Sequence, residues 1–482
     1  MRIIVVGGGI AGLGTALACA RDGHQVTVLE RDDTPMPPDA DAAFGWQRTG
    51  APQVRHSHAF LARLRNLLRD RAPDVLEALF ASGAAEIRFT DDLPLTLTDR
   101  SLRPGDEELV ALACRRTTFE WVLRKLALAE PGVEFRHGVA ASALDANPAR
   151  PGAIPLVVGV DGVAADLVVD ARGPRSSSAE WLAAVGAPPV AEELNESGIV
   201  YFSRFYRVRS GVEAPPYVGP TAADLGYLKY AIFLGDNRTF SITYAIESHD
   251  DELRRALATP DAFEAVARFL VAVAPWRLEG VADPITDVHV MAGLRNRFRP
   301  LVGVDGAPLV HGFVTVGDAS VCTNPLYGRG CSLALVHAFG LADAMREHTS
   351  DLTAALVAFD DFTTEELDPW FRAAVLQDAE SKALAASPGD DTTDGGTNAM
   401  LRAVMRDGLV PAIQTSPVVF RAFLRWFNLL ARPDALIADG EVVSEVMAAY
   451  ATRESRPPPP ALGPTRDELL AALGRSDAEL AQ

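Results

Sequence analysis

Residues 2–30 read RIIVVGGGIAGLGTALACARDGHQVTVLE, and this stretch decides the fold of the N-terminal region. The run RIIVV at 2–6 is short and β-branched, which is typical of a strand buried in a parallel sheet. A glycine-rich turn of the pattern G-x-G-x-x-G follows at 7–12, and residues 13–20 then have the composition of a helix. Residues 25–30 form a second strand. This order predicts a βαβ unit at the N-terminus.

The spacing of the glycines predicts a dinucleotide site. Gly7 permits a tight turn, Gly9 lets the backbone approach a pyrophosphate, and Gly12 lets helix and strand pack closely. The helix that starts behind them offers free N–H groups and the positive end of its dipole to phosphate. Glu30 ends the second strand 18 residues after Gly12, where an acid hydrogen-bonds a ribose 2′-hydroxyl. An acid there disfavours a 2′-phosphate, so we expect FAD or NAD rather than NADP.

Composition excludes several classes of protein. The 482 residues are 48% hydrophobic and 23% charged, which is ordinary globular usage. A net charge of −19 disfavours nucleic acid and anionic lipid as partners. The cysteines are scattered without zinc-like spacing, and the histidines have no acidic cluster beside them, so we expect no metal. No apolar run approaches the ~18 residues of a membrane helix, and we expect a soluble, cytoplasmic protein.

A second glycine-bearing region favours FAD over NAD. A buried strand ends at Gly317-Asp318, and a loop with Gly328 and Gly330 leads into an apolar helix. An aspartate at that place can accept a hydrogen bond from a ribitol hydroxyl. The helix start can place N–H groups near the N1–C2 edge of a flavin, where the reduced ring carries negative charge.

These segments resemble a known family. VVGGGIAGLGTALACARDGHQVTVLERD, VVDARGPRSS and TVGDASVCTNPLYGRGCSLALVHA are similar, in this order, to motifs of the FAD-dependent monooxygenase superfamily. That superfamily includes aromatic hydroxylases, squalene epoxidase and polyether epoxidases. GAPQVRHSH at 50–58 and CRRTTFE at 114–120 look most like the epoxidase branch. The resemblance covers roughly residues 1–375.

The resemblance implies an α/β fold class: a Rossmann-type FAD-binding domain, a substrate domain with a mixed β-sheet and a C-terminal helical region. We expect residues 1–60, 105–185 and 290–375 to form the discontinuous FAD-binding domain. Residues 61–104 and 186–289 are then the substrate domain, and residues 376–482 are the helical region. Aromatic residues alternate on predicted strands between 199 and 246, with a hairpin signal at 235–237, so we expect a separate antiparallel sheet across roughly residues 190–290. Most of these aromatic residues are expected to form packing core.

Individual roles follow from the same resemblance. FAD would be bound by Gly7, Gly9, Ile10, Ala11, Gly12, Glu30, Arg31, Arg55, Arg116, Val139, Asp170, Gly173, Gly317, Asp318, Gly328 and Gly330. Arg31 would lie beside the ribose and adenine, Arg116 at the flavin or pyrophosphate, and Val139 against adenine through its backbone. Candidates for the lining of the substrate pocket are His56, His58, Pro325 and Tyr327. No residue is assigned to acid–base catalysis, and no metal is expected.

The middle motif departs from the hydroxylase pattern. Classical hydroxylases have Asp-Gly there, and it serves both FAD and NADPH, whereas this chain has Asp170-Ala171-Arg172-Gly173. Asp170 and Gly173 can keep the shape of the loop. Electrons are expected from NADH or NADPH, either directly or through a partner flavin reductase.

The implied function is monooxygenation. Reduced flavin would react with O2 to give a C4a-hydroperoxide, which transfers one oxygen to a hydrophobic alkene or aromatic substrate, with polyketides and terpenoids as candidates. One alternative is a flavin-dependent reductase or dehydrogenase of a polyprenoid or polyketide. Another is a flavin halogenase, although no lysine precedes Lys125 and no W-x-W-x-I-P segment occurs. A third is an idle flavin-binding partner protein.

Overall fold

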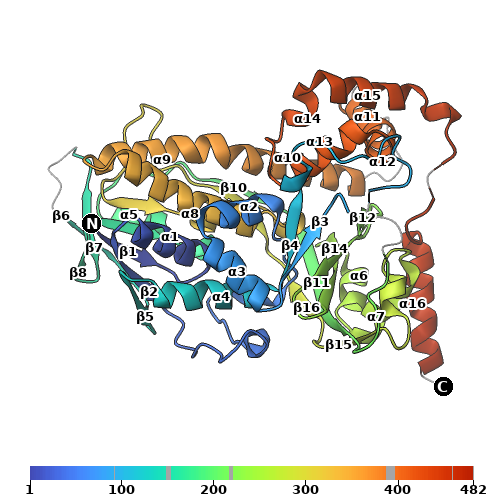
Figure 1. Cartoon of the computed structure of the whole chain (residues 1–482), viewed down its shortest axis with the longest axis horizontal. Coiled ribbons are helices and arrows are strands. Elements are labelled where there is room, and N and C mark those ends of the chain that lie inside the picture. Colours follow the sequence, from blue (N-terminus) through green and yellow to red (C-terminus); the bar gives the residue numbers. More distant parts are fainter. Residues whose placement is uncertain (92, 148–152, 217–220, 387–396, 459, 481–482) are drawn as a thin grey trace.

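A five-stranded parallel sheet forms the centre of the N-terminal half, as the βαβ motif predicts (Figure 1). The computed structural model describes residues 1–482 except 92, 148–152, 217–220, 387–396, 459 and 481–482. In spatial order the strands are β18 (Phe313–Thr315), β9 (Leu167–Asp170), β1 (Arg2–Val6), β2 (Gln25–Glu30) and β5 (Val133–His137). Ile3 pairs with Val26 on one side and Leu167 on the other. Strands far apart in sequence therefore end at one edge.

Both faces of this sheet are buried, which explains its β-branched strands. Ile3 and Val5 join a core with helices α1 (Ile10–Arg21), α4 (Arg116–Ala129) and α8 (Gly330–Glu347). Ile4 and Val6 point the other way, toward α5 (Ser178–Ala184) and a small antiparallel sheet. That sheet comprises β6 (Leu144–Asn147), β7 (Leu156–Val160) and β8 (Val163–Ala164).

Three further helices extend the first core. They are α2 (Ala62–Arg71), α3 (Pro73–Ala81) and α9 (Leu352–Glu366), and Leu64 and Leu79 share a core with α1. Strand β3 (Ala85–Arg88) pairs with β4 (Val110–Ala113). Much of the segment 61–104, which we expected in the substrate domain, thus packs on the cofactor side. The domain boundaries themselves stay a prediction.

A second, antiparallel sheet lies across residues 199–291, close to the range expected from the aromatic pattern. The hairpin predicted at 235–237 joins two of its strands. Its main order is β12 (Ala222–Asp224), β13 (Lys229–Leu234), β14 (Thr239–Glu247), β11 (Ile199–Val208) and β15 (Ala282–Pro284), and β16 (His289–Met291) also pairs with β11. A three-stranded sheet of β10 (Glu193–Glu196), β17 (Arg295–Phe298) and β19 (Val321–Cys322) is separate from it.

Strand alternation gives the second sheet two different faces. Tyr206, Phe240 and Tyr244 belong to a core with α6 (Asp251–Leu257), α7 (Pro260–Phe269) and α16 (Arg466–Leu480). Ser203 and Thr243, which form a register pair, are on the opposite face. The expectation of an aromatic packing core is therefore confirmed for Tyr230, Phe240 and Tyr244, while Tyr201 and Phe205 share the face of Ser203.

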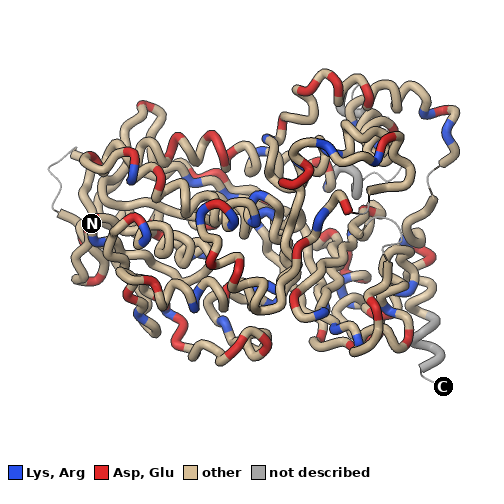
Figure 2. The backbone as a smooth tube through the Cα atoms, in the orientation of Figure 1, with Lys and Arg blue, Asp and Glu red and all other residues tan. Residues whose placement is uncertain are grey.

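The C-terminal region is helical, as expected, and most of its helices gather at the upper right of Figure 1. They are α10 (Asp368–Ala386), α11 (Thr397–Val404), α12 (Val410–Thr415), α13 (Pro417–Phe427), α14 (Ala435–Ala438) and α15 (Gly440–Ala451), with a π-helical turn at Met405–Leu409. Figure 2 shows acidic residues over every part of the molecule. Among the described helices, none combines the length and apolar character needed to cross a membrane.

Candidate cofactor and substrate site

Three turns predicted to bind FAD meet at the carboxyl edge of the parallel sheet. The Gly7 N–H donates to the Leu29 carbonyl at 2.9 Å. A Cβ added to Gly7 would lie 2.7 Å from the Ala171 carbonyl oxygen, and one added to Gly317 would lie 2.7 Å from Ala11 Cβ. The turns after β1, β9 and β18 therefore touch. Crevices at such strand ends are where open α/β sheets bind ligands.

The glycines of the first turn fall into two groups: Gly7 and Gly12 lie against other backbone atoms, whereas Gly9 borders open space. Gly7 has a φ of +109°, and a Cβ on Gly12 would overlap the Gly7 carbonyl oxygen, so both serve backbone packing. A Cβ on Gly9 would meet nothing within 4 Å. Helix α1 also starts without a side-chain cap. Open space beside uncapped N–H groups fits a pyrophosphate at Gly9, Ile10 and Ala11.

Backbone N–H groups fix the Glu30 carboxylate beside this turn. Its Oε2 accepts from the Gly8 N–H and its Oε1 from the Asp32 N–H, both at 2.9 Å. The Val139 N–H donates to the Glu30 carbonyl at 2.9 Å, so Val139 lies beside Glu30. Arg31 is exposed next to Gly50. This arrangement fits a ribose and adenine, and those roles stay predictions.

A group of buried charged residues surrounds the turn, and we name it the buried charge cluster: Arg48, Arg116, Arg124, Glu30, Asp32 and Glu120. Its ion pairs include Arg48 to Glu120 at 3.0 Å and Arg116 to Glu120 at 2.9 Å. Arg124 donates to the Gly8 carbonyl at 2.8 Å. Sequence reasoning found only Arg116 and Glu30. A signal did exist, because Arg116, Glu120 and Arg124 recur every four residues on an otherwise apolar helix.

Several N–H groups of the buried charge cluster make no hydrogen bond within the described chain. They are Nε and Nη1 of Arg48, Nε of Arg116, and Nε and Nη1 of Arg124. Arg124 lies against the Trp46 and Phe135 rings at 4.8 and 4.9 Å, and burial lowers its pKa to about 10. Buried donors without acceptors are costly, and oxygens of a diphosphate would satisfy them. The residues present therefore fit FAD.

Asp318 and Asp170 differ in whether side chains of the protein hydrogen-bond their carboxylates. Asp318 is partly buried, no described residue hydrogen-bonds its carboxylate, and burial raises its pKa to about 6 despite Arg116 and Arg297 nearby. It is available to ligand hydroxyls. Asp170 is fully buried and accepts from Arg172 and Ser176 at 2.7 and 2.6 Å. Asp170 therefore shapes the loop that contains Gly173.

A directed chain of hydrogen bonds supports the Gly317 turn from behind, and sequence reasoning missed it. The Gly317 N–H donates to His337 Nδ1 at 3.1 Å, and His337 Nε2 lies 2.9 Å from Thr363 Oγ1. Thr363 donates to the Phe359 carbonyl at 2.7 Å. Only a neutral His337 protonated at Nε2 satisfies all three bonds, and burial lowers its pKa to about 3. A lone histidine on an apolar helix offered no signal for this role.

The loop before α8 is held by residues from other parts of the chain. Asn324 accepts from the Tyr201 hydroxyl at 2.8 Å and donates to Asp378 at 2.7 Å. Pro325 is exposed and Tyr327 is half-buried in this loop. A Cβ on Gly330 would meet nothing within 4 Å, which leaves room for a flavin edge at the start of α8.

A hollow separates the buried charge cluster from the second sheet. It is lined by His56, His58, Cys114, Arg115, Arg116, Phe205, Phe233, Leu234, Gly235, Phe240 and Ser241. His58 Nδ1 donates to the His56 carbonyl at 2.9 Å, which leaves its Nε2 as an acceptor. Burial lowers the pKa of His58 to about 3. The lining of the hollow thus combines apolar side chains, mainly aromatic, with polar and charged groups that could orient a substrate. We call it the substrate hollow.

Arg55 is not part of this arrangement. Its side chain is exposed and donates to Gln47 at 2.5 Å. Its role in FAD binding stays a prediction.

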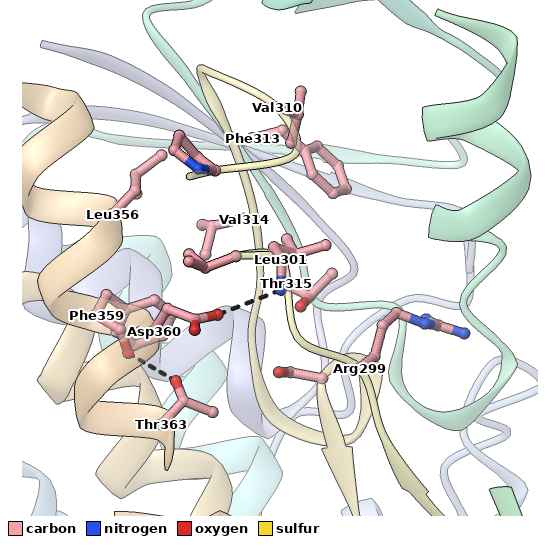
Figure 3. A pocket seen from close by; sticks show the side chains of 13 residues that line it. Arg299, Leu301, Val310, Phe313, Val314, Thr315, Leu356, Phe359, Asp360 and Thr363 are labelled. Atoms are coloured by element: carbon pink, nitrogen blue, oxygen red, sulfur yellow. Dashed lines mark hydrogen bonds between the residues drawn. The ribbon is translucent and has the colours of Figure 1, made fainter. Parts of the chain in front are cut away.

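Another hollow lies between α9 and residues 299–320 (Figure 3). Asp360 accepts from the Leu301 N–H at 3.2 Å across it, and Thr363 lies at its edge. Its lining includes none of the residues predicted for FAD or substrate.

Comparisons with known proteins agree with this geometry. Residues 2–116 match the family model "FAD dependent oxidoreductase". The chain is 27% identical to Protein Rv3254 of Mycobacterium tuberculosis, over 89% of each chain. It is 26% identical to aklavinone 12-hydroxylase DnrF of Streptomyces peucetius subsp. caesius, over 70% of this chain and 66% of that protein.

Solved structures share the fold. The flavin-dependent halogenase CmlS superposes with a TM-score of 0.57 at 17% identity, over 100% of this chain and 78% of its own. The matched motif region and the converging turns indicate an FAD-dependent oxidoreductase, and the chain is similar in sequence to the hydroxylase DnrF and in fold to the halogenase CmlS.

Proposed function

We propose that this enzyme uses FAD to insert one oxygen atom of O2 into a hydrophobic organic substrate bound in the substrate hollow. The observation that carries the proposal is the position of that hollow. It lies between Arg116 of the buried charge cluster and the aromatic face of the second sheet, where Phe205 and Phe233 line it. A substrate there would be next to the flavin and shielded from water.

The chain's own residues would bind and orient the two reactants. Gly9, Arg116 and Arg124 would hold the diphosphate, and Asp318 the ribitol. The N–H groups at the start of α8 would face the flavin edge, where a helix N-terminus stabilises negative charge. His58 Nε2 and the Ser241 hydroxyl would be the polar contacts of an otherwise apolar substrate. FAD, when bound and reduced, supplies the electrons that activate O2.

We further propose an aromatic or alkene substrate, with polyketides and terpenoids as candidates. The hydroxylase relative, whose name states an aklavinone substrate, supports the aromatic polyketide option. Electrons would come from NADH or NADPH, directly or through a flavin reductase. A halogenase that depends on lysine is not supported, because Lys125 and Lys229 are outside the lining of the substrate hollow and Lys382 donates to the Glu196 carbonyl.

The test begins with the visible spectrum of the purified protein and its reduction by NADH and NADPH in parallel. We expect a yellow protein that binds one FAD. Candidate aromatic polyketides and alkenes are then supplied under ¹⁸O2, and the product should gain one labelled oxygen. A folded, colourless protein that refuses FAD would contradict the cofactor. Product oxygen from labelled water alone, halide incorporation, or turnover without O2 would contradict monooxygenation.

A further inference from the structure

A continuous row of hydroxyl groups runs along the face of the second sheet that borders the substrate hollow. His56 Nδ1 lies 3.3 Å from Ser203 Oγ, and Ser203 Oγ lies 3.0 Å from Thr243 Oγ1. Thr243 donates to Ser57 Oγ at 2.6 Å, and Ser57 donates to Ser241 Oγ at 2.7 Å. No gap interrupts the row from the imidazole to Ser241. We call these five residues the hydroxyl chain.

The direction of the bonds is consistent along the hydroxyl chain. Because Thr243 donates to Ser57, its own oxygen must accept from Ser203, and Ser203 then accepts from the Nδ1–H of His56. Each hydroxyl gives one proton and receives one. The last hydroxyl, Ser241, donates to no acceptor among the described residues and lines the substrate hollow. Its proton is therefore free for a ligand.

The other end of the hydroxyl chain leads toward the surface. The His56 and His289 rings lie 6.2 Å apart, and His289 is half-buried beside the exposed Arg55. Ser203 and Ser241 are fully buried, with Thr243 nearly so. Buried hydroxyls on a sheet face would ordinarily be replaced by apolar groups, unless the row itself has a use.

We propose that the hydroxyl chain is a proton relay that delivers a proton from His56 to an oxygen of the bound substrate at Ser241. The substrate would therefore carry a hydroxyl or carbonyl oxygen at that place, which excludes a plain hydrocarbon alkene. In one transfer the Ser241 O–H bond breaks and a substrate O–H bond forms. Ser57, Thr243 and Ser203 each donate one proton to the next member of the chain and accept one from the member before. His56 donates its Nδ1 proton to Ser203, and its Nε2 accepts a proton that enters from the direction of His289.

The experiment uses the FAD-loaded enzyme and 4-nitrophenol, whose phenolate is coloured and whose oxygen can take the place at Ser241. After a rapid drop in pH, the absorbance of the bound phenolate decreases as the phenolate takes up a proton. The absorbance of the FAD-loaded enzyme without the probe is subtracted, and the rate of the remaining decrease is the rate of proton transfer. Thr243→Val removes the middle hydroxyl without altering the lining of the hollow. We expect this variant to protonate the probe at least about tenfold more slowly than the unaltered enzyme.

Two further variants make the result specific. Ser203→Ala breaks the hydroxyl chain one link earlier and should slow the probe similarly, which covers a failure of the valine variant to fold. Thr239→Val is the matched control, because Thr239 is buried on the same strand but donates to the Asp236 carbonyl outside the chain. It should leave the rate unchanged. The probe's Kd should stay within about twofold in all three variants.

The proposal rests on the proposed function, and the two can fail separately. A colourless protein would end the flavin assignment before the probe is added. A yellow protein that binds no 4-nitrophenol would overturn the substrate class inferred here. Equal protonation rates in the unaltered enzyme and in the Thr243→Val and Ser203→Ala variants would overturn the relay.

Discussion

Two polar groups of residues face each other across the substrate hollow, and they are built from opposite chemistry. At the carboxyl edge of the parallel sheet, the buried charge cluster contains three arginines and three carboxylates within one buried region. On the antiparallel sheet, the hydroxyl chain contains three serines, one threonine and one histidine, and burial lowers the pKa of that histidine to about 4. One side is charged and the other is neutral.

This difference shows which ligand each side is suited to hold. Arginines whose N–H groups lack acceptors are suited to an anion that brings its own charge, such as a diphosphate. Neutral hydroxyls cannot compensate a charge, but they can exchange protons without separating charge over a distance. The net charge of −19 would repel the same diphosphate, so the local arginines have to supply the attraction.

The largest effect should come from the packing of the first turn. Gly12→Val places carbon where the Gly7 carbonyl already lies, so we expect loss of FAD binding and destabilisation by about 3 kcal/mol or more. Gly9→Ala enters open space and should leave the urea midpoint nearly unchanged while FAD binding weakens. Urea unfolding and FAD titration test both. Equal damage by the two variants would show that Gly9 is a packing residue as well.

Removal of a single charge from the buried charge cluster should have the next largest effect. Arg116→Met leaves Glu120 short of one partner and removes a donor to the diphosphate, so we expect about a 100-fold loss of FAD affinity. Arg55→Ala, at an exposed arginine, should change FAD affinity by less than about twofold. Fluorescence titration of the apoprotein with FAD measures both. A large loss in Arg55→Ala would restore Arg55 to the cofactor site.

Asp318→Asn should weaken FAD binding by about tenfold and yet stabilise the apoprotein. The folded pKa of Asp318 is raised to about 6 from 3.8, so the folded state binds the proton more tightly than the unfolded state. The carboxylate is therefore unfavourable above pH 6, and the penalty disappears as pH falls through 6 toward 3.8. We expect the variant to be more stable at pH 8 and similar to the parent near pH 4. Urea unfolding of apoprotein at the two pH values tests this, and a variant destabilised at pH 8 would contradict it.

The smallest effect should come from the support behind Gly317. His337→Phe keeps the ring stack on Phe359 but leaves the Gly317 N–H without an acceptor, and we expect FAD affinity to fall about fivefold. His337→Asn restores an acceptor near Nδ1 and should recover most of that loss. The visible spectrum of bound FAD gives a second readout. If both variants lose stability equally and bind FAD normally, His337 only fills space.

Sequence reasoning worked best where the chain forms its structure locally. The first turn, its two strands and the hairpin at 235–237 depend on residues next to each other, and glycine spacing sets their shape directly. It also identified Arg116 and Asp318, which the fold does bring together. Glu120 and Arg124 were missed, although they follow Arg116 at successive intervals of four residues.

Other features had no local signal at all. Arg48 lies in an irregular segment, and its burial against Glu120 depends on how that segment crosses α4. Ser57 meets Thr243 across 186 residues of sequence, so nothing next to either residue shows the contact. The helices of the segment 61–104 pack on the cofactor side because their apolar faces contact the core around α1. The amphipathic pattern of a helix predicts that one face is buried, but it does not predict which element covers that face.

By itself, the sequence of this protein predicted a nucleotide site at the first βαβ turn, because backbone shape at glycines and one acid at a strand end are local properties, and the second glycine-bearing region at 317–330 favoured FAD. Tertiary structure alone decided which charges are buried around that turn and which face of the second sheet borders the substrate hollow. Burial and proximity arise when distant segments pack, and only then do a guanidinium, a hydroxyl and an imidazole acquire their chemical roles.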